Sequence, residues 1–312
     1  MMNGQDRLYS KKWGVFTHYL YATPSAPNRI SGETDWNKRV DSVDVEKIAK
    51  TLHEVGAGYY FITVMQGRKY MLGPNAAFDR IGGTKPGEAC SNRDLIMELA
   101  LALEKYDIDL YLYFTGDGPY KDEEVGRRFG FTAPRKNISM EFVQNWAEVL
   151  KEYAVRYGSH VKGWWIDGCY GEQFGYTQEL LQLYHDAIKA GNPDAVSAFN
   201  NGVKPTLEKW FHGEEFTAGE YIDFTVLPES RFIDGAQAHT LIPLGVDPAG
   251  NLWGGWCETG MRRSAEHIID YVKKFNAAGG VVTLDVKIWG DGSFDPEQVA
   301  FLKQLGQAVP TK

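Results

Sequence analysis

The residue best suited to chemistry in this sequence is Asp167, an acid that ends the apolar run 161–166. Trp164 and Trp165 precede it, and Gly168 follows it and permits a tight turn. A carboxylate placed there is held rigidly beside aromatic rings. Cleavage of a glycosidic bond requires two carboxyl groups: one attacks or stabilises the oxocarbenium-like state, and the other donates and then accepts a proton. Asp167 fits the first role, and the alternative is that it only caps the following turn.

The elements that position this acid follow a repeated pattern, in which a short apolar run precedes an amphipathic segment. Such a pattern is typical of parallel βα units. We expect strands at 14–20, 59–65, 109–115, 161–167, 195–200 and 281–286, and helices at 45–55, 91–103, 142–157, 178–189, 264–277 and 296–308. In the irregular stretch 201–260 we expect short strands near 223–227 and at 239–244 or 252–256. The pattern predicts an α/β fold, a (β/α)8 TIM-type barrel that forms a single domain over residues 1–312.

Polar residues at the ends of the expected strands are the best candidates for a site, because barrels of this kind build their active sites at the carboxyl ends of the strands. The residues that meet this condition are His18, Gln66, Thr115, Asp117, Asp167, Asn200, Asn201, Glu258 and Asp285. Candidates for aromatic walls are Trp36, Tyr113, Trp165, Trp253 and Trp256, with packing in the core as the alternative for each. His53, His185 and His267 fall within expected helices and receive no role.

Motifs along nearly the whole chain resemble those of one enzyme family. They lie at 12–19 (K-W-G-V-F-T-H-Y), 44–63, 93–99, 164–168 (W-W-I-D-G) and 279–292. In the same order they are similar to F-G-I-F-x-H-W-G, to a D-x-x-x-x-A segment, to R-D-x-x-x-E-L, to W-x-D-G and to G-G-N-L-L-L-N-V-G-P-x-x-D-G of the α-L-fucosidases of glycoside hydrolase family 29. This resemblance implies a retaining, exo-acting α-glycoside hydrolase that needs no cofactor, here without the β-sandwich that many members append.

The resemblance also implies catalytic roles. Asp167 takes the place of the nucleophile of the family. The stretch 211–220 lies where the acid/base is usually found, and its likeness to G-D-x-x-T-P-E favours Glu220. Four other glutamates stay open as the acid/base, each with a solvated loop position as the alternative. They are Glu172, Glu214, Glu215 and Glu258.

Residues that would hold the sugar follow from the same comparison. His18 takes the place of a sugar-binding histidine, and Tyr19 stands where the family has tryptophan. Trp36 and Trp165 match positions that contact sugar. The complete expected substrate-binding set is His18, Tyr19, Trp36, Gln66, Tyr113, Trp165, Asn200, Trp256 and Glu258.

Two departures from the family pattern concern the substrate. Where the family has two sugar-binding histidines after its second strand, this chain has Met65 and Gln66, and Gly202 replaces an arginine after the fifth strand. Each lost charge-assisted contact is worth about 1.5–3 kcal/mol. We therefore expect a deoxy or decorated sugar rather than plain L-fucose. The alternatives are a carbohydrate-binding pseudoenzyme, or a lyase or metal-dependent hydrolase on the same barrel.

The composition limits the possible partners. The formal net charge is −8 without a basic stripe, which argues against nucleic acid and anionic membranes. The sequence contains no apolar run of 18 residues, so we expect no membrane span. Cys169 and Cys257 fall near strand ends and could line the site or simply pack as small apolar residues. No spacing supports a metal site, although Asp167, His212 and His239 could be imagined as ligands.

The expected partner is therefore a small-molecule or oligosaccharide substrate, and the oligomeric state is open. The N-terminal residues lack an apolar signal core. The sequence leaves the location open: we expect a periplasmic or secreted protein if a signal was removed, and a cytoplasmic one otherwise.

Overall fold

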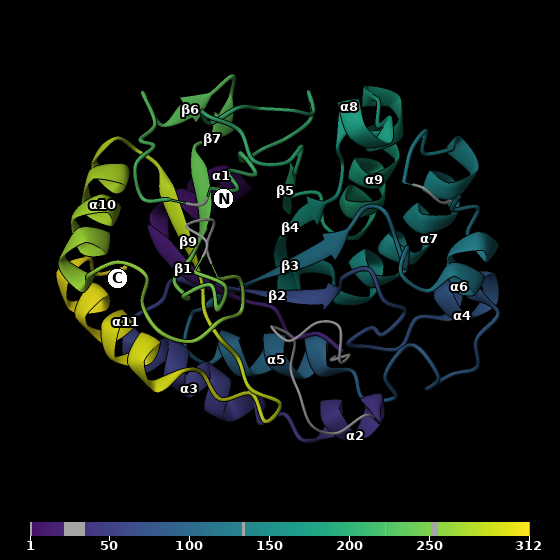
Figure 1. Cartoon of the computed structure of the whole chain (residues 1–312), viewed down its shortest axis with the longest axis horizontal. Coiled ribbons are helices and arrows are strands. Elements are labelled where there is room, and N and C mark those ends of the chain that lie inside the picture. The colour runs from purple at the N-terminus through teal and green to yellow at the C-terminus, as the bar shows by residue number, and fades with distance from the viewer. Residues whose placement is uncertain (1, 22–34, 133–134, 222, 251–254, 312) are drawn as a thin grey trace.

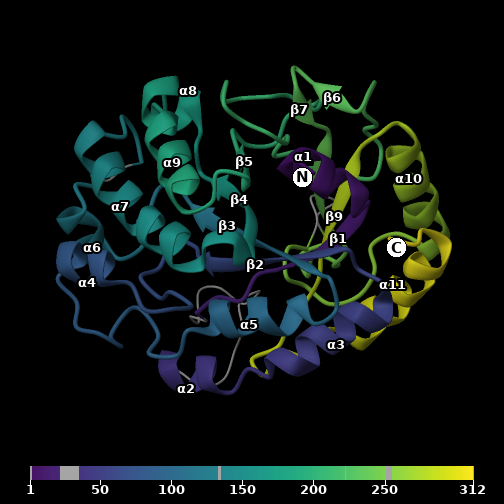
Figure 2. The same ribbon diagram turned by 180° about the vertical axis from the view of Figure 1, so that it is seen from behind.

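The computed structural model describes residues 2–21, 35–132, 135–221, 223–250 and 255–311. A curled sheet of seven parallel strands, in the order β5-β4-β3-β2-β1-β9-β8, lies inside a layer of helices (Figures 1 and 2). The strands are β1 (Trp13–Thr17), β2 (Tyr59–Met65), β3 (Asp109–Thr115), β4 (Val161–Asp167), β5 (Val196–Phe199), β8 (His239–Pro243) and β9 (Val281–Asp285). The expected α/β TIM-like barrel is confirmed, and the described chain contains no β-sandwich.

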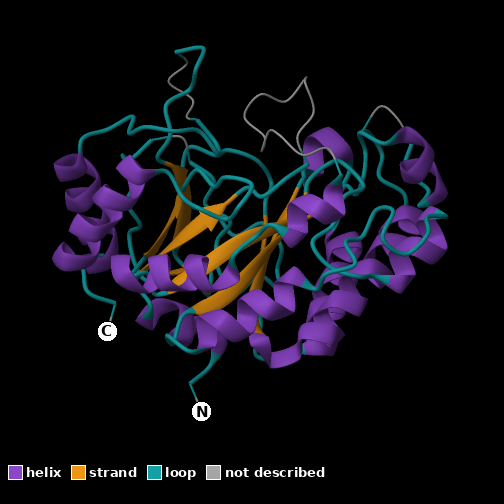
Figure 3. Ribbon diagram, turned by 90° about the horizontal axis from the view of Figure 1, so that it is seen from below, coloured by secondary structure: helices purple, strands orange, loops and turns teal. Residues whose placement is uncertain are grey.

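Most helices follow strands and pack on the outside of the sheet, whereas α1 precedes β1 and its Leu8 packs with the side chains inside the barrel. The helices are α1 (Gly4–Ser10), α2 (Trp36–Asp41), α3 (Val45–Val55), α4 (Ala76–Gly82), α5 (Leu95–Glu104), α6 (Glu123–Arg128), α7 (Met140–Tyr157), the 3₁₀ turn η1 (Gly158–His160), α8 (Gly171–Phe174), α9 (Gln178–Gly191), α10 (Ala265–Ala277) and α11 (Pro296–Ala308). Within the described residues, no helix is both long and apolar enough to cross a membrane. Figure 3 shows the loops gathered at one end of the barrel and both termini at the other.

Capping residues set where these helices begin. Asp44 accepts the backbone N–H of Lys47 and begins α3, as its sequence position predicts. The prediction that Ser91 opens α5 is wrong, because Asp94 is the residue that caps this helix by accepting the N–H of Met97. The three histidines without a role, His53, His185 and His267, do lie in the helices α3, α9 and α10.

Between β5 and β8 the barrel is closed by the irregular segment 215–221. Glu215 N–H donates to Ser197 O of β5 at 2.9 Å. On the other side, Tyr221 N–H donates to Leu241 O of β8 at 3.1 Å. This segment therefore occupies the eighth strand position with only partial pairing. Beside it lies a small antiparallel hairpin of β6 (Phe232–Ile233) and β7 (Ala236–Gln237).

Gly219 accounts for the irregular path of this segment. Its φ is 57°, and a Cβ there would lie 2.0 Å from His239 O. The prediction of a strand near 223–227 is wrong, because Phe224 packs on Tyr271 of α10 instead of pairing with the sheet. The expected strand 239–244 is β8, and most of 252–256 lies outside the described residues.

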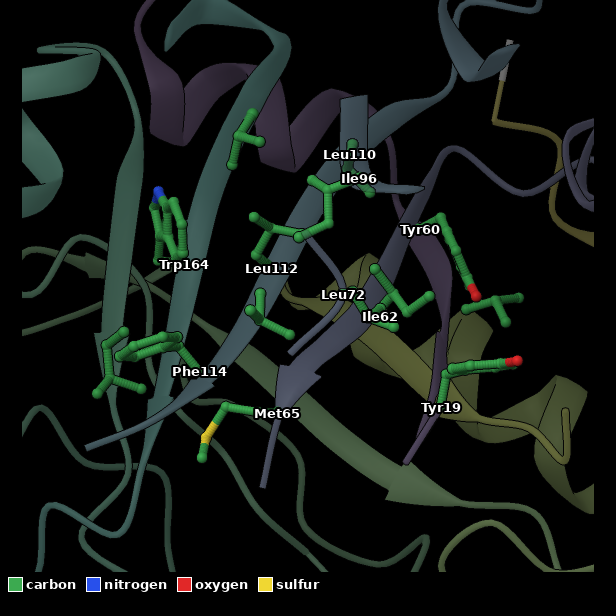
Figure 4. Close-up of a cluster of buried hydrophobic side chains, with 14 of the residues drawn as sticks. Tyr19, Tyr60, Ile62, Met65, Leu72, Ile96, Leu110, Leu112, Phe114 and Trp164 are labelled. Carbon is green, nitrogen blue, oxygen red and sulfur yellow. The ribbon is translucent and has the colours of Figure 1, made fainter. Parts of the chain in front are cut away.

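Alternate residues of each strand enter two separate cores. Side chains that point outward pack under the helices, as Figure 4 shows for Ile62, Leu112 and Trp164. Side chains that point inward fill the barrel and include Phe61 and Trp165. This alternation has a period of two, so neighbouring residues of one strand serve different layers. The inner core ends below the carboxyl ends of the strands, where a cavity begins.

Candidate active site

A cavity of about 220 Å³ lies at the carboxyl ends of the barrel strands. Its lining consists of Phe16, His18, Gln66, Tyr113, Trp165, Asp167, Glu220, Leu241, Trp256 and Cys257. The strands β1 to β4 and β8, the closing segment and the loop before α10 each contribute. Most of the residues expected from sequence to bind or cleave a sugar are thus brought together here, although they are far apart in the chain.

Aromatic rings form one wall of the cavity. The ring of Tyr113 stacks between those of Phe16, at 5.7 Å, and Trp165, at 5.4 Å. The indole N–H of Trp165 donates to Ala218 O at 2.9 Å, which fixes the ring. Trp256 lies beside the His18 ring at 5.8 Å. The cavity therefore offers flat apolar surface together with a small number of polar groups, as ligand sites usually do.

Asp167 is oriented by two neighbouring side chains. Tyr113 Oη donates to its Oδ2 at 2.5 Å, and Asn200 Nδ2 donates to its Oδ1 at 2.8 Å. Both bonds come from adjacent strands rather than from the following turn, so the turn-capping alternative does not describe this carboxylate. Gly168 makes the turn with a φ of 70°. A Cβ at that position would lie 2.9 Å from the carboxyl group of Asp117.

Asn200 joins the two carboxyl groups of the cavity. The same Nδ2 that contacts Asp167 also donates to Glu220 Oε2 at 2.6 Å. Its Oδ1 accepts the N–H of Gly202 at 3.0 Å, which fixes the orientation of the amide. The bonded oxygens of Asp167 and Glu220 therefore lie no farther apart than the sum of the two distances, about 5.4 Å. Retaining glycosidases place their two carboxyl groups about 5–5.5 Å apart, whereas inverting enzymes separate them by about 6.5–9.5 Å.

Glu220 differs from Asp167 in its electrostatic environment. Burial and the nearby charge of Asp167 raise the pKa of Glu220 from 4.5 to about 7, while the bond from Asn200 acts in the opposite direction. Glu220 can therefore hold a proton near neutral pH. Two adjacent acids whose environments separate their protonation states can divide the roles of general acid and nucleophile.

The other four glutamates that were open as the acid/base lie outside the cavity. Glu214 is buried and accepts the backbone N–H groups of Phe199 and Phe211, and Glu215 binds Ser197 and pairs with Lys189. Glu172 is exposed on α8, and Glu258 is half-buried and is not among the residues that line the cavity. Of the five glutamates, Glu220 is the one that faces Asp167.

His18 is held by the last strand of the barrel. Its Nδ1 donates to Asp285 Oδ1 at 2.8 Å, and Asp285 Oδ2 accepts the backbone N–H of Cys257 at 2.6 Å. Asp285 is almost fully buried. Because Nδ1 is occupied, Nε2 is the ring nitrogen that His18 can present to a ligand. Cys257 lines the cavity, whereas Cys169 is buried away from it.

Several expected site residues lie elsewhere. Tyr19 points into the outer core (Figure 4) and donates to Gly290 O at 2.8 Å, and the indole N–H of Trp36 donates to Met71 O at 2.8 Å. Both therefore support the loops of the barrel and do not line the cavity. Trp253 lies outside the described residues.

Other polar strand-end residues also have structural partners. Thr115 Oγ1 donates to Asp117 Oδ1 at 2.5 Å, and Asp117 is buried and paired with Arg135. The two histidines that could be imagined as metal ligands are separated from the carboxylates. His239 is buried and bonded to Thr217 and Thr283, and His212 is exposed. No cluster of three His, Cys, Asp or Glu side chains suited to a metal occurs among the described residues.

Sequence reasoning missed Tyr170. It is half-buried and lies close to Asp167, whose charge is the first cause that raises the pKa of its hydroxyl. Its ring stacks on Phe174 at 4.9 Å. An aromatic residue three positions after a strand-end acid is the signal that could have identified it. Phe16 and Leu241 were missed as well, although strand alternation places both inside the barrel.

Comparison with known proteins shows which family and which solved structures the chain is similar to. A family model described as Alpha-L-fucosidase matches residues 39–311. No curated protein sequence matches the chain.

Solved structures with the same fold are similar at low sequence identity. The endo-fucoidan hydrolase MfFcnA4 from glycoside hydrolase family 107 has 13% identity and a TM-score of 0.72, and the match covers 97% of this chain and 53% of that one. An alpha-L-fucosidase of family 29 from Bacteroides thetaiotaomicron has 19% identity and a TM-score of 0.67, and the match covers 97% of this chain and 72% of that one. The endo-fucoidan hydrolase P5AFcnA has 12% identity and a TM-score of 0.68, and the match covers 96% of this chain and 92% of that one. The chain thus spans about half the length of the first of these proteins, and the likeness is one of fold.

Proposed function

The chain belongs to the alpha-L-fucosidase family and is a glycoside hydrolase, and from this premise we propose that it is a retaining, exo-acting α-glycosidase. The observation that carries the proposal is the bridge from Asn200 to both Asp167 and Glu220. It keeps the bonded oxygens of the two carboxyl groups within about 5.4 Å of each other, below the separation of about 6.5–9.5 Å with which inverting enzymes admit a water molecule.

In the first step, the Asp167 carboxylate attacks the anomeric carbon and Glu220 donates its proton to the departing oxygen. Tyr113 and Asn200 hold the attacking carboxylate in place. Formation of the glycosyl ester removes the negative charge of Asp167, which is one cause of the raised pKa of Glu220. The pKa of Glu220 therefore falls once the ester has formed, so that Glu220 stays deprotonated after it has given up its proton. It can then act as the base that accepts a proton from the water that hydrolyses the ester.

The size and lining of the cavity support the substrate class. Its volume of about 220 Å³ is below the range of about 300–1,000 Å³ of sites for drug-sized ligands, which favours a single terminal sugar ring. Phe16 and Leu241 provide apolar surface for the methyl group of a deoxy sugar. The names of the related structures point to fucose-type sugars.

The lost family contacts favour a deoxy or decorated sugar other than plain L-fucose. Gln66 stands where the family has its histidine pair, and it lines the cavity. His18 is then the polar family contact that remains for a ring hydroxyl, with Asp285 behind it.

A panel of aryl α- and β-glycosides of L-fucose, L-rhamnose, D-galactose and L-arabinose tests the proposal. We expect turnover of one α-glycoside, its loss in Asp167→Asn, and partial rescue of Asp167→Ala by azide with an inverted glycosyl azide as product. Full activity of Asp167→Asn, or selective turnover of β-glycosides, would show that the assignment is wrong.

A further inference from the structure

Tyr170 stands three positions after the nucleophile, and its backbone is held by the residues that follow β5. Cys169 N–H donates to Asn200 O at 3.0 Å. Gly171 N–H donates to Asn201 Oδ1 at 3.0 Å. Asn200 is also the residue that bridges the two catalytic carboxyl groups. Both neighbours of Tyr170 are therefore fixed to the segment that carries this bridge.

The ring of Tyr170 lies against Gly202, a residue without a side chain. Gly202 stands where the family has arginine, and its φ is 85°. A Cβ at Gly202 would lie 3.6 Å from Cε1 of the Tyr170 ring. Gly202 N–H donates to Asn200 Oδ1 at 3.0 Å, so the ring lies next to the turn that orients the bridging amide. The absence of a side chain at position 202 leaves this place to the Tyr170 ring.

A second contact of the ring is anchored by a buried ion pair. Tyr170 stacks on Phe174, with ring centres 4.9 Å and ring planes 20° apart. The guanidinium carbon of Arg135 lies 4.3 Å from the centre of the Phe174 ring and 3.8 Å from that of Tyr120. The same guanidinium group pairs with Asp117, whose side chain is fully buried. The stack that orients Tyr170 is therefore tied to the end of the barrel rather than to a free loop.

The hydroxyl of Tyr170 is a hydrogen-bond donor without a use inside the described part of the chain. It makes no hydrogen bond with a described residue, and its side chain is half-buried. The charge of Asp167, burial and the charge of Glu220 raise the pKa of this hydroxyl, so it keeps its proton at the pH of the reaction. Tyr170 does not itself line the cavity, but Asp167 and Glu220 both do. A sugar bound at these two carboxyl groups therefore comes close to the hydroxyl.

The chemistry of the proposed reaction decides which sugar atom receives this bond. A sugar whose anomeric carbon faces both carboxyl groups offers three polar atoms there: the bridging oxygen, the ring oxygen and the 2-hydroxyl. Glu220 serves the bridging oxygen as the acid. A donor to the ring oxygen would oppose the positive charge of the oxocarbenium-like state, whereas bonds to the 2-hydroxyl strengthen in that state. We propose that Tyr170 donates a hydrogen bond to the 2-hydroxyl of the cleaved sugar, an inference that rests on the proposed hydrolase function.

Tyr170→Phe removes the hydroxyl and keeps the ring that stacks on Phe174. Tyr9→Phe is the matched control, because Tyr9 is an exposed tyrosine of α1 at the opposite end of the barrel (Figure 3). The first pair of probes is the 4-nitrophenyl α-glycoside of the sugar that the panel selects and its 2-deoxy analogue, with spontaneous hydrolysis subtracted. The third probe is the 2-deoxy-2-fluoro glycosyl fluoride of the same sugar, whose rate of labelling is measured. The last two probes lack the 2-hydroxyl.

We expect kcat/KM of Tyr170→Phe on the parent glycoside to fall roughly two- to tenfold, the effect of one neutral hydrogen bond. Most of this loss should lie in kcat rather than in KM, because the bond is strongest in the transition state. On the 2-deoxy glycoside the variant should equal the wild type, and its rate of labelling by the fluoro compound should also be unchanged. Tyr9→Phe should equal the wild type with all three probes. Thermal unfolding of Tyr170→Phe should match the wild type, because no intramolecular hydrogen bond is lost.

Other results would refute specific statements. An unchanged kcat/KM of Tyr170→Phe on the parent glycoside would overturn the role of Tyr170. A loss of equal size with a probe that lacks the 2-hydroxyl would overturn it as well, because the hydroxyl would then act on something other than that group. Either result leaves the proposed hydrolase function intact. Absence of turnover by the wild type across the whole panel would overturn the hydrolase function, and the role of Tyr170 would fail with it.

Discussion

Replacement of Asn200 by alanine perturbs both catalytic groups at once, because one amide nitrogen contacts Asp167 at 2.8 Å and Glu220 at 2.6 Å. Loss of the bridge frees both carboxyl groups to move relative to each other. Misplacement of catalytic groups by about 1 Å costs on the order of 100-fold in rate. We therefore expect kcat/KM of Asn200→Ala to fall by about 10- to 100-fold on the aryl glycoside that the panel selects.

The pH profile of the same variant provides a readout that mere loss of stability would not change. Glu220 must be protonated to act as the acid, so activity falls as the pH rises through its pKa, which lies at about 7 in the free protein. The bond from Asn200 lowers this pKa, and its removal raises it. We expect the basic limb of the kcat/KM profile of Asn200→Ala to move to higher pH.

Asn192→Ala is the matched control, because Asn192 Nδ2 donates to Val161 O at the far end of β4, at 3.1 Å. The control should lose stability without a shift in the pH profile. A basic limb of Asn200→Ala that stays in place or moves to lower pH would refute the assignment of Glu220 as the acid under the influence of Asn200.

Three further substitutions probe the same site. Tyr113→Phe removes the donor to Asp167 Oδ2 and should lower kcat roughly tenfold at nearly unchanged melting temperature; an unchanged kcat would exclude a positioning role. Asp285→Asn, which weakens the hold on His18 Nδ1, should raise KM roughly tenfold with a smaller change in kcat; steady-state kinetics that show the reverse would contradict this role. Glu220→Gln should equal the wild type in stability below pH 4.5 and exceed it above pH 7 by no more than about 3 kcal/mol. The reason is that a carboxyl group whose pKa is raised in the folded state destabilises the fold as the pH rises from 4.5 to 7. Denaturant unfolding at pH 4 and pH 8 that shows no such difference would contradict the raised pKa of Glu220.

The strands that form the core of the barrel could be predicted closely, because each is an apolar run with clear ends. β2, β3 and β4 begin and end at the residues expected from sequence. The closing segment 215–221 could not be predicted, because its residues do not form such a run and Gly219 follows a path that only contact with β8 requires. Its geometry depends on neighbours on both sides rather than on local propensity.

The site was partly predictable for a related reason. Asp167 is visible in sequence because it ends an apolar run, but its partner Asn200 is recognised only when β4 and β5 lie side by side. His18 and Asp285 meet because β1 and β9 are neighbours in the closed sheet, and they are separated by most of the chain.

Tyr19 shows how the side of an element can be misjudged from sequence. It follows His18 directly, and backbone alternation turns it into the outer core, whereas the His18 side chain lines the cavity. A resemblance to a family motif identifies a position but does not state to which side the side chain points.

The most direct test of the central claim is peptide mass mapping after incubation with the 2-deoxy-2-fluoro glycosyl fluoride of the sugar that the panel selects. Such a compound slows hydrolysis of the glycosyl ester and traps the intermediate on the nucleophile. The account predicts one added sugar per chain, attached to the peptide that contains Asp167 and absent in Asp167→Asn. A stable adduct on another residue, or turnover of the compound without any adduct and with inversion at the anomeric carbon, would contradict it.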